Sequence, residues 1–181
     1  SPHRIRSGRE RYAKMTMASV LFVPEPRTIL VIGLGGGTLP MAFHRLFNQT
    51  TIHAVEIDTA VVKVAKKYFD LIENDQIKVF SQDGRVFTKR AKAKSLKYDL
   101  IILDAFNGDY IPEHLMTREY LQENRSILST NGLLASNTFS TSALYDHESE
   151  TYASVFGNLV NFKRIETNNR VLFAPVNKPD Q

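Results

Sequence analysis

The chain has 181 residues, a net charge of +4, 43% hydrophobic and 23% charged residues, values typical of one soluble globular domain. It contains no cysteine, which excludes disulfides and thiolate metal sites, and we expect no bound metal. No apolar run approaches the roughly 20 residues that span a bilayer, so we expect no membrane contact in this segment and a cytoplasmic location.

The most basic stretch of the chain runs from Lys89 to Lys97. It has no interleaved aromatic residues and no recognition motif, so we interpret it as a solvated helix end or loop. The sequence therefore predicts no nucleic-acid partner.

The distribution of polar, apolar and proline residues divides the chain into three parts. Residues 1–27 are predicted to form an N-terminal arm and a short helix, Tyr12 to Phe22, that packs on the sheet and stops before Pro24. Residues 28–176 are predicted to form the main domain, and residues 177–181 a tail.

The main domain opens with a strand, a glycine-rich turn, a helix and a second strand. Ile29 to Ile32 is an apolar β-branched run, followed by Gly33, Gly35, Gly36 and Gly37. Thr38 to Phe47 has helical spacing, and the strand Ile52 to Ile57 carries Glu56 about 20 residues past the glycines. This spacing is typical of a nucleoside-binding βαβ unit, so we expect residues 28–176 to form a nucleoside-binding domain.

Helices and strands alternate through the rest of the chain. Asp58 is placed to cap a helix with Val61, Val62, Ala65 and Phe69 facing inward. The further predicted elements are a strand over Ile77–Phe80, a helical connection over Phe87–Lys94, a strand over Tyr98–Leu103, a helix from near Thr117 to Asn131 that includes Ile127 and Leu128, a strand over Gly132–Phe139, a helix over Leu144–Leu159, and a hairpin of Phe162–Thr167 with Val171–Pro175. This order predicts an α/β fold with a doubly wound, mostly parallel sheet, helices on both faces and a C-terminal antiparallel hairpin.

Polar residues follow the predicted parallel strands at the ends where such sheets bind ligands. They are the glycine turn Gly33–Gly37, Glu56, Asp83, Asp104 and Asn137. Glycines let the backbone approach a ligand closely, and a carboxylate can accept both hydroxyls of a ribose. Asp83 can accept from an adenine amine, and Asp104 can pair with a cationic amine but would repel a phosphate. A nucleoside with a sulfonium and an amine therefore fits better than a dinucleotide.

Four stretches in order resemble the spermidine synthase family of aminopropyltransferases, most closely its divergent bacterial members. They are LVIGLGGGTLP, AVEIDTAVVKVAKKYF, SQDGRVF and YDLIILDAFNGDYIPEHLMTREYL, and the similarity runs from about Tyr12 to Phe139. The resemblance implies a Rossmann-like, methyltransferase-type fold with a seven-stranded sheet. It also implies S-adenosylmethionine or its decarboxylated form as cofactor, a small-molecule amine as substrate, and methylthioadenosine as product.

The resemblance gives each site residue an expected role. Glu56 would hold the ribose, Asp83 the adenine, and Asp104 the aminopropyl side of the cofactor. The full set of expected cofactor contacts is Gly33, Gly35, Gly37, Glu56, Ile57, Asp83, Gly84 and Asp104; the expected substrate contacts are Tyr12, Asn107, Tyr110 and Asn137; the expected catalytic residues are Asp104 and Asp109.

Some positions depart from the family pattern. Gly35 and Asn107 stand where the family has aspartates, and Asn137 stands where it has a glutamine. An amide is not a general base at neutral pH, so we take Asp109 as a displaced base. Three activities stay open: aminopropyl transfer to a putrescine-like amine, methyl transfer to an unknown acceptor, and nucleoside binding without turnover. Family members often form homodimers, but no interface is legible in the sequence.

Overall fold

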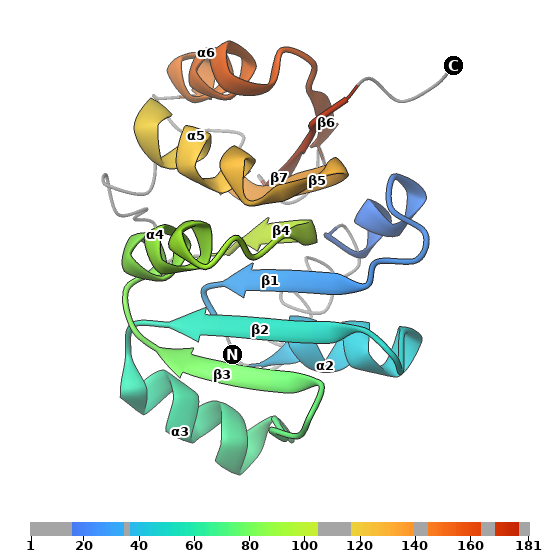
Figure 1. Cartoon of the computed structure of the whole chain (residues 1–181), viewed down its shortest axis with the longest axis vertical. Helices are drawn as coiled ribbons and strands as arrows, with labels where there is room; N and C mark the ends of the chain where they lie inside the picture. The colour runs from blue at the N-terminus through green and yellow to red at the C-terminus, as the bar shows by residue number, and fades with distance from the viewer. Residues whose placement is uncertain (1–15, 35–36, 105–116, 140–144, 164–168, 178–181) are drawn as a thin grey trace.

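The protein folds into one seven-stranded sheet with helices on both faces (Figure 1). The structure is a computed structural model that describes residues 16–34, 37–104, 117–139, 145–163 and 169–177. Its strands are β1 (Thr28–Ile32), β2 (Thr51–Glu56), β3 (Ile77–Ser81), β4 (Tyr98–Leu103), β5 (Leu128–Phe139), β6 (Val160–Lys163) and β7 (Asn169–Pro175). Its helices are the 3₁₀ turn η1 (Ala18–Leu21), α2 (Thr38–Leu46), α3 (Thr59–Tyr68), α4 (Gly84–Ala93), α5 (Arg118–Ser126) and α6 (Tyr145–Phe156).

The strand order is β3-β2-β1-β4-β5-β7-β6. Strands β1 to β5 pair in parallel, whereas β7 lies antiparallel between β5 and β6. The prediction of a doubly wound, mostly parallel sheet with a closing antiparallel hairpin is confirmed. The chain runs outward from β1 to β3 and then returns to the other side of β1, so the strand order reverses between β1 and β4. Ligands bind at this reversal in open α/β sheets.

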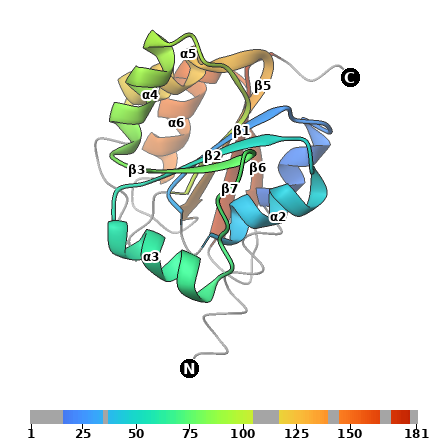
Figure 2. The same ribbon diagram turned by 60° about the horizontal axis from the view of Figure 1, so that its bottom comes forward.

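Helices cover both faces of the sheet (Figure 2), and a cluster of buried apolar side chains lies on each face. Helices α4, α5 and α6 pack on one face, around residues such as Phe87, Tyr120 and Phe156. Helices α2 and α3 and the turn η1 cover the other face. Strands β1 and β4 are buried on both sides, which explains their continuous apolar sequences.

Three side chains cap helices as their residue types favour. Asp58 accepts from the backbone of Ala60 at the start of α3, as predicted. Asp83 caps α4 and Thr117 caps α5 in the same way. Helix α4 therefore begins at Gly84, three residues before the predicted start at Phe87.

The predicted helix from Thr117 to Asn131 is too long. Helix α5 ends at Ser126, and Leu128 already pairs with Tyr98 of β4. The register shifts between Tyr98 and Leu100, so an irregular first part of β5 adds Leu128 to the sheet. Ile127 and Leu128 are buried for this reason rather than as one side of a helix.

Two apolar residues in or next to the predicted helices are exposed, and for one of them, Phe69, an inward position was predicted. Phe69 is 41% exposed, because α3 ends at Tyr68 and Leu71 fills the place beside Val62 and Ala65. Leu21 is 75% exposed, although its neighbours Met17, Val20 and Phe22 pack on the sheet as expected.

The last elements keep their predicted order with shifted bounds. β6 begins at Val160 and β7 at Asn169, each two residues before its predicted start. Helix α6 ends at Phe156, and Gly157 follows it with a positive φ of 81°. No helix in the described ranges is both long and apolar enough to span a bilayer.

Candidate functional site

The carboxyl ends of β1, β2, β4 and β5 meet along one edge of the sheet. Ile32 lies beside Val55 on one side and beside Leu103 on the other. The Asp104 backbone N–H donates to the Ile32 carbonyl at 2.7 Å, and Leu103 lies beside Ser136. The edge therefore gathers the residues that follow these strands, as the sequence predicts.

The glycine turn needs glycine at two described positions. Gly33 has a φ of 91° and donates its N–H to the Val55 carbonyl at 2.8 Å. Gly37 has a φ of 76°, and a Cβ there would lie 3.1 Å from the Leu71 Cβ. Both backbone shapes favour glycine, and both bring the start of α2 close to the strand ends.

The Glu56 carboxylate joins the glycine turn to the loop after β2. Its Oε2 accepts from the Leu34 N–H and its Oε1 from the Asp58 N–H, both at 2.9 Å. The next side chain, Ile57, is apolar and 66% exposed at the same edge. An anchored carboxylate beside an open apolar side chain fits a ribose with its flat base.

Asp83 and Gly84 lie where β3 passes into α4. Asp83 Oδ1 accepts from the Arg85 and Val86 N–H groups at 2.9 and 3.0 Å, so this oxygen caps the helix. A Cβ at Gly84 would lie 2.6 Å from the Ile32 Cγ2, which shows that α4 starts in direct contact with β1. The structure thus gives both residues a structural role, and their predicted cofactor contacts stay predictions.

Asp104 and Asn137 are brought together across β4 and β5. The Asn137 Nδ2 donates to the Asp104 Oδ1 at 3.2 Å. Both side chains are half-buried, and they lie beside the point where the strand order reverses. A carboxylate fixed in this place can accept a hydrogen bond from a positively charged amine.

The remaining predicted site residues lie outside the described residues: Tyr12, Gly35, Asn107, Asp109 and Tyr110. The described part of the edge is acidic, through Glu56, Asp83 and Asp104. No cluster of three or more metal-ligating side chains occurs within the described ranges.

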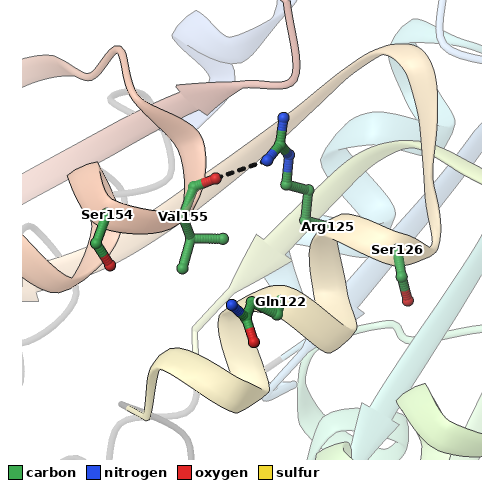
Figure 3. Close-up of a pocket in the computed structure, with 5 residues that line it drawn as sticks. All are labelled: Gln122, Arg125, Ser126, Ser154 and Val155. Atoms are coloured by element: carbon green, nitrogen blue, oxygen red, sulfur yellow. Dashed lines mark hydrogen bonds between the residues drawn. The ribbon is translucent and has the colours of Figure 1, made fainter.

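A groove of about 340 Å³ lies elsewhere, between α5 and α6 (Figure 3). It is lined by Gln122, Arg125, Ser126, Ser154 and Val155. Ser126 precedes β5, and Leu128 pairs with the first residue of β4, so the groove lies toward the amino ends of these strands. Arg125 Nη1 donates to the Val155 carbonyl at 2.8 Å, which places this cation at the end of α6 rather than at the acidic edge.

Sequence reasoning missed a buried polar cluster behind the end of β5. Arg170 on β7 and Glu148 on α6 lie 3.6 Å apart, and Tyr152 donates to the Ser136 Oγ at 2.7 Å. Burial raises the pKa of Glu148 to about 7, although the Arg170 charge opposes this effect. Burial raises the pKa of Tyr152 as well. Glu148 lies among other acidic and polar residues of α6, so the sequence does not mark it as buried. Arg170 comes close to Glu148 because β7 pairs with β5.

Strand order, glycine turn and acidic edge together define a Rossmann-like, methyltransferase-type α/β fold. The structure of human methyltransferase-like protein 13 in complex with SAH matches with a TM-score of 0.83 at 27% identity, covering 91% of this chain and 82% of that one. Spermidine synthase from Thermotoga maritima has the same fold, with a TM-score of 0.75 at 19% identity, covering 92% of this chain and 60% of that one.

The sequence comparisons narrow this class to a family. The family model described as "Spermine/spermidine synthase domain" matches residues 10–169, so the chain belongs to this family. It is 52% identical over 164 residues to a polyamine aminopropyltransferase of Vibrio vulnificus (strain CMCP6). That match covers 90% of this chain and 55% of the relative, so the chain spans about half the length of this curated relative.

Proposed function

We propose that the protein is a spermidine synthase-like aminopropyltransferase. It would transfer an aminopropyl group from decarboxylated S-adenosylmethionine to a putrescine-like amine, with methylthioadenosine as the other product. The observation that carries this proposal is the Asp104 carboxylate, held by Asn137 at the reversal of strand order. An acid there favours a cationic amine, and the similarity to the Vibrio vulnificus polyamine aminopropyltransferase supports the same reaction.

The described residues fit the nucleoside part of the cofactor. Glu56 would accept from the ribose hydroxyls, Ile57 would contact the base, and the backbone of Gly33 and Gly37 would approach the sulfur side. Asp83 would take the adenine amine. When bound, the cofactor supplies a carbon next to a sulfonium, which an amine can attack.

The chain itself has to bind the amine and take up its proton. Asp104 would orient an ammonium group, and its negative charge would be held in place by the Asn137 amide. Asp109 is our proposed base, because Asn107 cannot accept the proton at neutral pH. Tyr12, Asn107 and Tyr110 would complete the substrate contacts. Exchange of Asp109 for Asn should abolish turnover while the affinity for methylthioadenosine stays unchanged.

Calorimetry with S-adenosylmethionine, its decarboxylated form and methylthioadenosine, followed by a turnover assay with putrescine, tests the proposal directly. We expect decarboxylated S-adenosylmethionine to bind more tightly than S-adenosylmethionine, and putrescine to yield spermidine and methylthioadenosine. Asp104→Asn should weaken binding of the decarboxylated form by about tenfold or more, because a neutral amide loses a charge-assisted hydrogen bond worth about 1.5–3 kcal/mol. Tight binding of the intact form without aminopropyl transfer would contradict the proposal.

Methyl transfer is the second candidate. The similarity to human methyltransferase-like protein 13, together with Gly35 and Asn107 in place of the family's aspartates, favours it. This candidate predicts a preference for S-adenosylmethionine and the release of S-adenosylhomocysteine with a suitable acceptor. A chain that binds these nucleosides but turns over neither would instead be a nucleoside-binding homologue.

Two further parts of the proposal concern the oligomeric state and the cellular location of the protein. We expect a homodimer in the cytoplasm, in keeping with the family resemblance and the lack of cysteine. Light scattering of the purified chain measures its mass in solution, and a monomeric mass at high concentration would exclude the dimer.

A further inference from the structure

A fully buried ion pair joins α6 to β7. The Arg170 side chain is 0% exposed and the Glu148 side chain 4%, with Arg170 Nη2 and Glu148 Oε2 3.6 Å apart. Removing two charges from water costs about as much as their attraction returns, so such a pair is weak evidence for stability. Its position in the fold is more informative.

The pair lies directly behind the end of β5. Arg170 is opposite Thr138 in the antiparallel ladder between β7 and β5. Tyr152, one helical turn after Glu148, donates to the Ser136 Oγ at 2.7 Å. Helix α6 is therefore tied by polar contacts to the last residues of β5 and to the strand beside them.

These contacts hold the residues on both sides of Asn137. Side chains alternate along a strand, so Ser136 and Thr138 share one face of the sheet and Asn137 has the other. Asn137 follows Leu133 and Ala135, which pack on the face covered by α2. From that face its amide reaches Asp104.

We propose that the Glu148–Arg170 ion pair is a positioning element of the candidate site, which fixes the end of β5 so that Asn137 can hold Asp104. The effect is indirect, because neither Glu148 nor Arg170 is among the residues that we expect to touch a substrate. The consequence for substrate rests on the proposed function, whereas the consequence for the Asn137 amide does not.

The pair also makes this part of the molecule sensitive to pH near neutrality. Burial raises the pKa of Glu148 to about 7, so its carboxylate is protonated just below neutral pH. The groups that face it among the described residues are Arg170 from β7 and Tyr152 from its own helix, with Tyr120 of α5 acting on Tyr152 in turn. Loss of the carboxylate charge would remove its attraction to Arg170 and so change how α6 is held against β7 at this point.

Nuclear magnetic resonance of the Asn137 side-chain amide tests this inference without any substrate. We expect its resonances in the unmodified chain to shift between pH 6 and 8 with a midpoint near 7. Glu148→Gln should remove this midpoint, whereas Glu150→Gln, an exposed position on the same helix, should keep it. Resonances that do not move between pH 6 and 8, or an unchanged midpoint in Glu148→Gln, would overturn the inference.

A second variant covers the case in which Glu148→Gln does not fold, as judged by circular dichroism. Replacing both partners with apolar residues of similar size, Glu148→Leu with Arg170→Met, removes both charges and leaves neither unpaired. This variant should fold and show no midpoint in the Asn137 resonances. A folded double variant that retains the midpoint would overturn the inference.

Kinetics then separate this inference from the proposed function. If putrescine is a substrate, Glu148→Gln should raise KM for decarboxylated S-adenosylmethionine, whose amine Asp104 is proposed to bind, by about tenfold with little change in kcat, the pattern of weakened substrate binding. An unchanged KM beside active enzyme counts against the positioning role. If no amine reacts at all, the proposed function fails, and the Asn137 resonances still decide the positioning role.

Discussion

Glu56 holds two parts of the candidate site with one carboxylate, and its removal should be costly for binding. Glu56→Ala deletes the acceptor for Leu34 and Asp58 and the predicted acceptor for the ribose. We expect the affinity for methylthioadenosine, measured by calorimetry, to fall at least about tenfold, because charge-assisted hydrogen bonds are worth about 1.5–3 kcal/mol. Glu25→Ala, at an exposed position, should bind normally. An affinity within twofold of the unmodified chain would refute the assignment of Glu56.

Asp83 has two candidate roles that one substitution can separate. It caps α4 in the structure and is predicted to bind an adenine amine. Asp83→Ser keeps a good N-cap, so the melting temperature should change little. If the carboxylate also binds the base, the affinity for methylthioadenosine should still fall about fivefold or more. If a stable Asp83→Ser variant binds methylthioadenosine as tightly as the unmodified chain, the role of Asp83 in binding the base is excluded and its capping role remains.

The contact between α4 and β1 has no room for a side chain at Gly84. A Cβ there would lie 2.6 Å from Ile32, in a strand that is buried on both faces. We expect Gly84→Ala to destabilise the fold by about 1–3 kcal/mol through overpacking. Urea unfolding measures this value, and Lys92→Ala on the exposed side of α4 should change it by less than about 0.5 kcal/mol. An unfolding free energy for Gly84→Ala close to that of Lys92→Ala would contradict tight packing here.

Elements with clear local signals were predictable, and the misplaced boundaries have a common cause. The glycines and Asp58 marked the turn after β1 and the start of α3 through backbone shape and capping, which act within a few residues. The start of β5 could not be found in this way. Leu128 joins the sheet through an irregular pairing with Tyr98, 30 residues earlier in the chain, which no local pattern encodes.

The candidate site likewise has features that local sequence predicts and features that depend on pairing between distant strands. The position of Glu56 and Asp104 at one edge was predictable from their spacing, because parallel strands bring their carboxyl ends together there. Their roles toward a ligand stay predictions. The Asn137–Asp104 hydrogen bond follows from the pairing of β4 with β5 and was expected only as proximity. The Glu148–Arg170 pair needed β7 to insert beside β5, so the sequence alone gave no sign of it.

The free energy of unfolding of the whole molecule should depend on pH through the ionisation of Glu148. Its pKa of about 7 in the folded chain lies above its ordinary value of 4.5, so the folded chain binds this proton more tightly than the unfolded chain. The stability that this proton gives is complete below about pH 4.5 and is lost as the pH rises through 7. Each pH unit between the two values is worth about 1.4 kcal/mol, so the loss amounts to about 3 kcal/mol.

Urea unfolding of the unmodified chain and of Glu148→Gln between pH 4.5 and 8 checks this effect. The free energy of unfolding of the unmodified chain should fall, relative to that of the variant, as the pH rises through this range. Glu150→Gln should follow the unmodified chain. Parallel curves for the unmodified chain and Glu148→Gln would mean that Glu148 titrates at its ordinary pH.

The position of β7 has a consequence for how the protein is made. β6 leaves the ribosome before β7 but joins the sheet through β7, which lies between it and β5. Until residues 169–175 have been synthesised, β5 has a free edge with unpaired backbone groups, and β6 has no place to dock. The nascent chain is therefore exposed to wrong strand pairing until β7 has been synthesised, and the Arg170 that completes the ion pair arrives in that same strand.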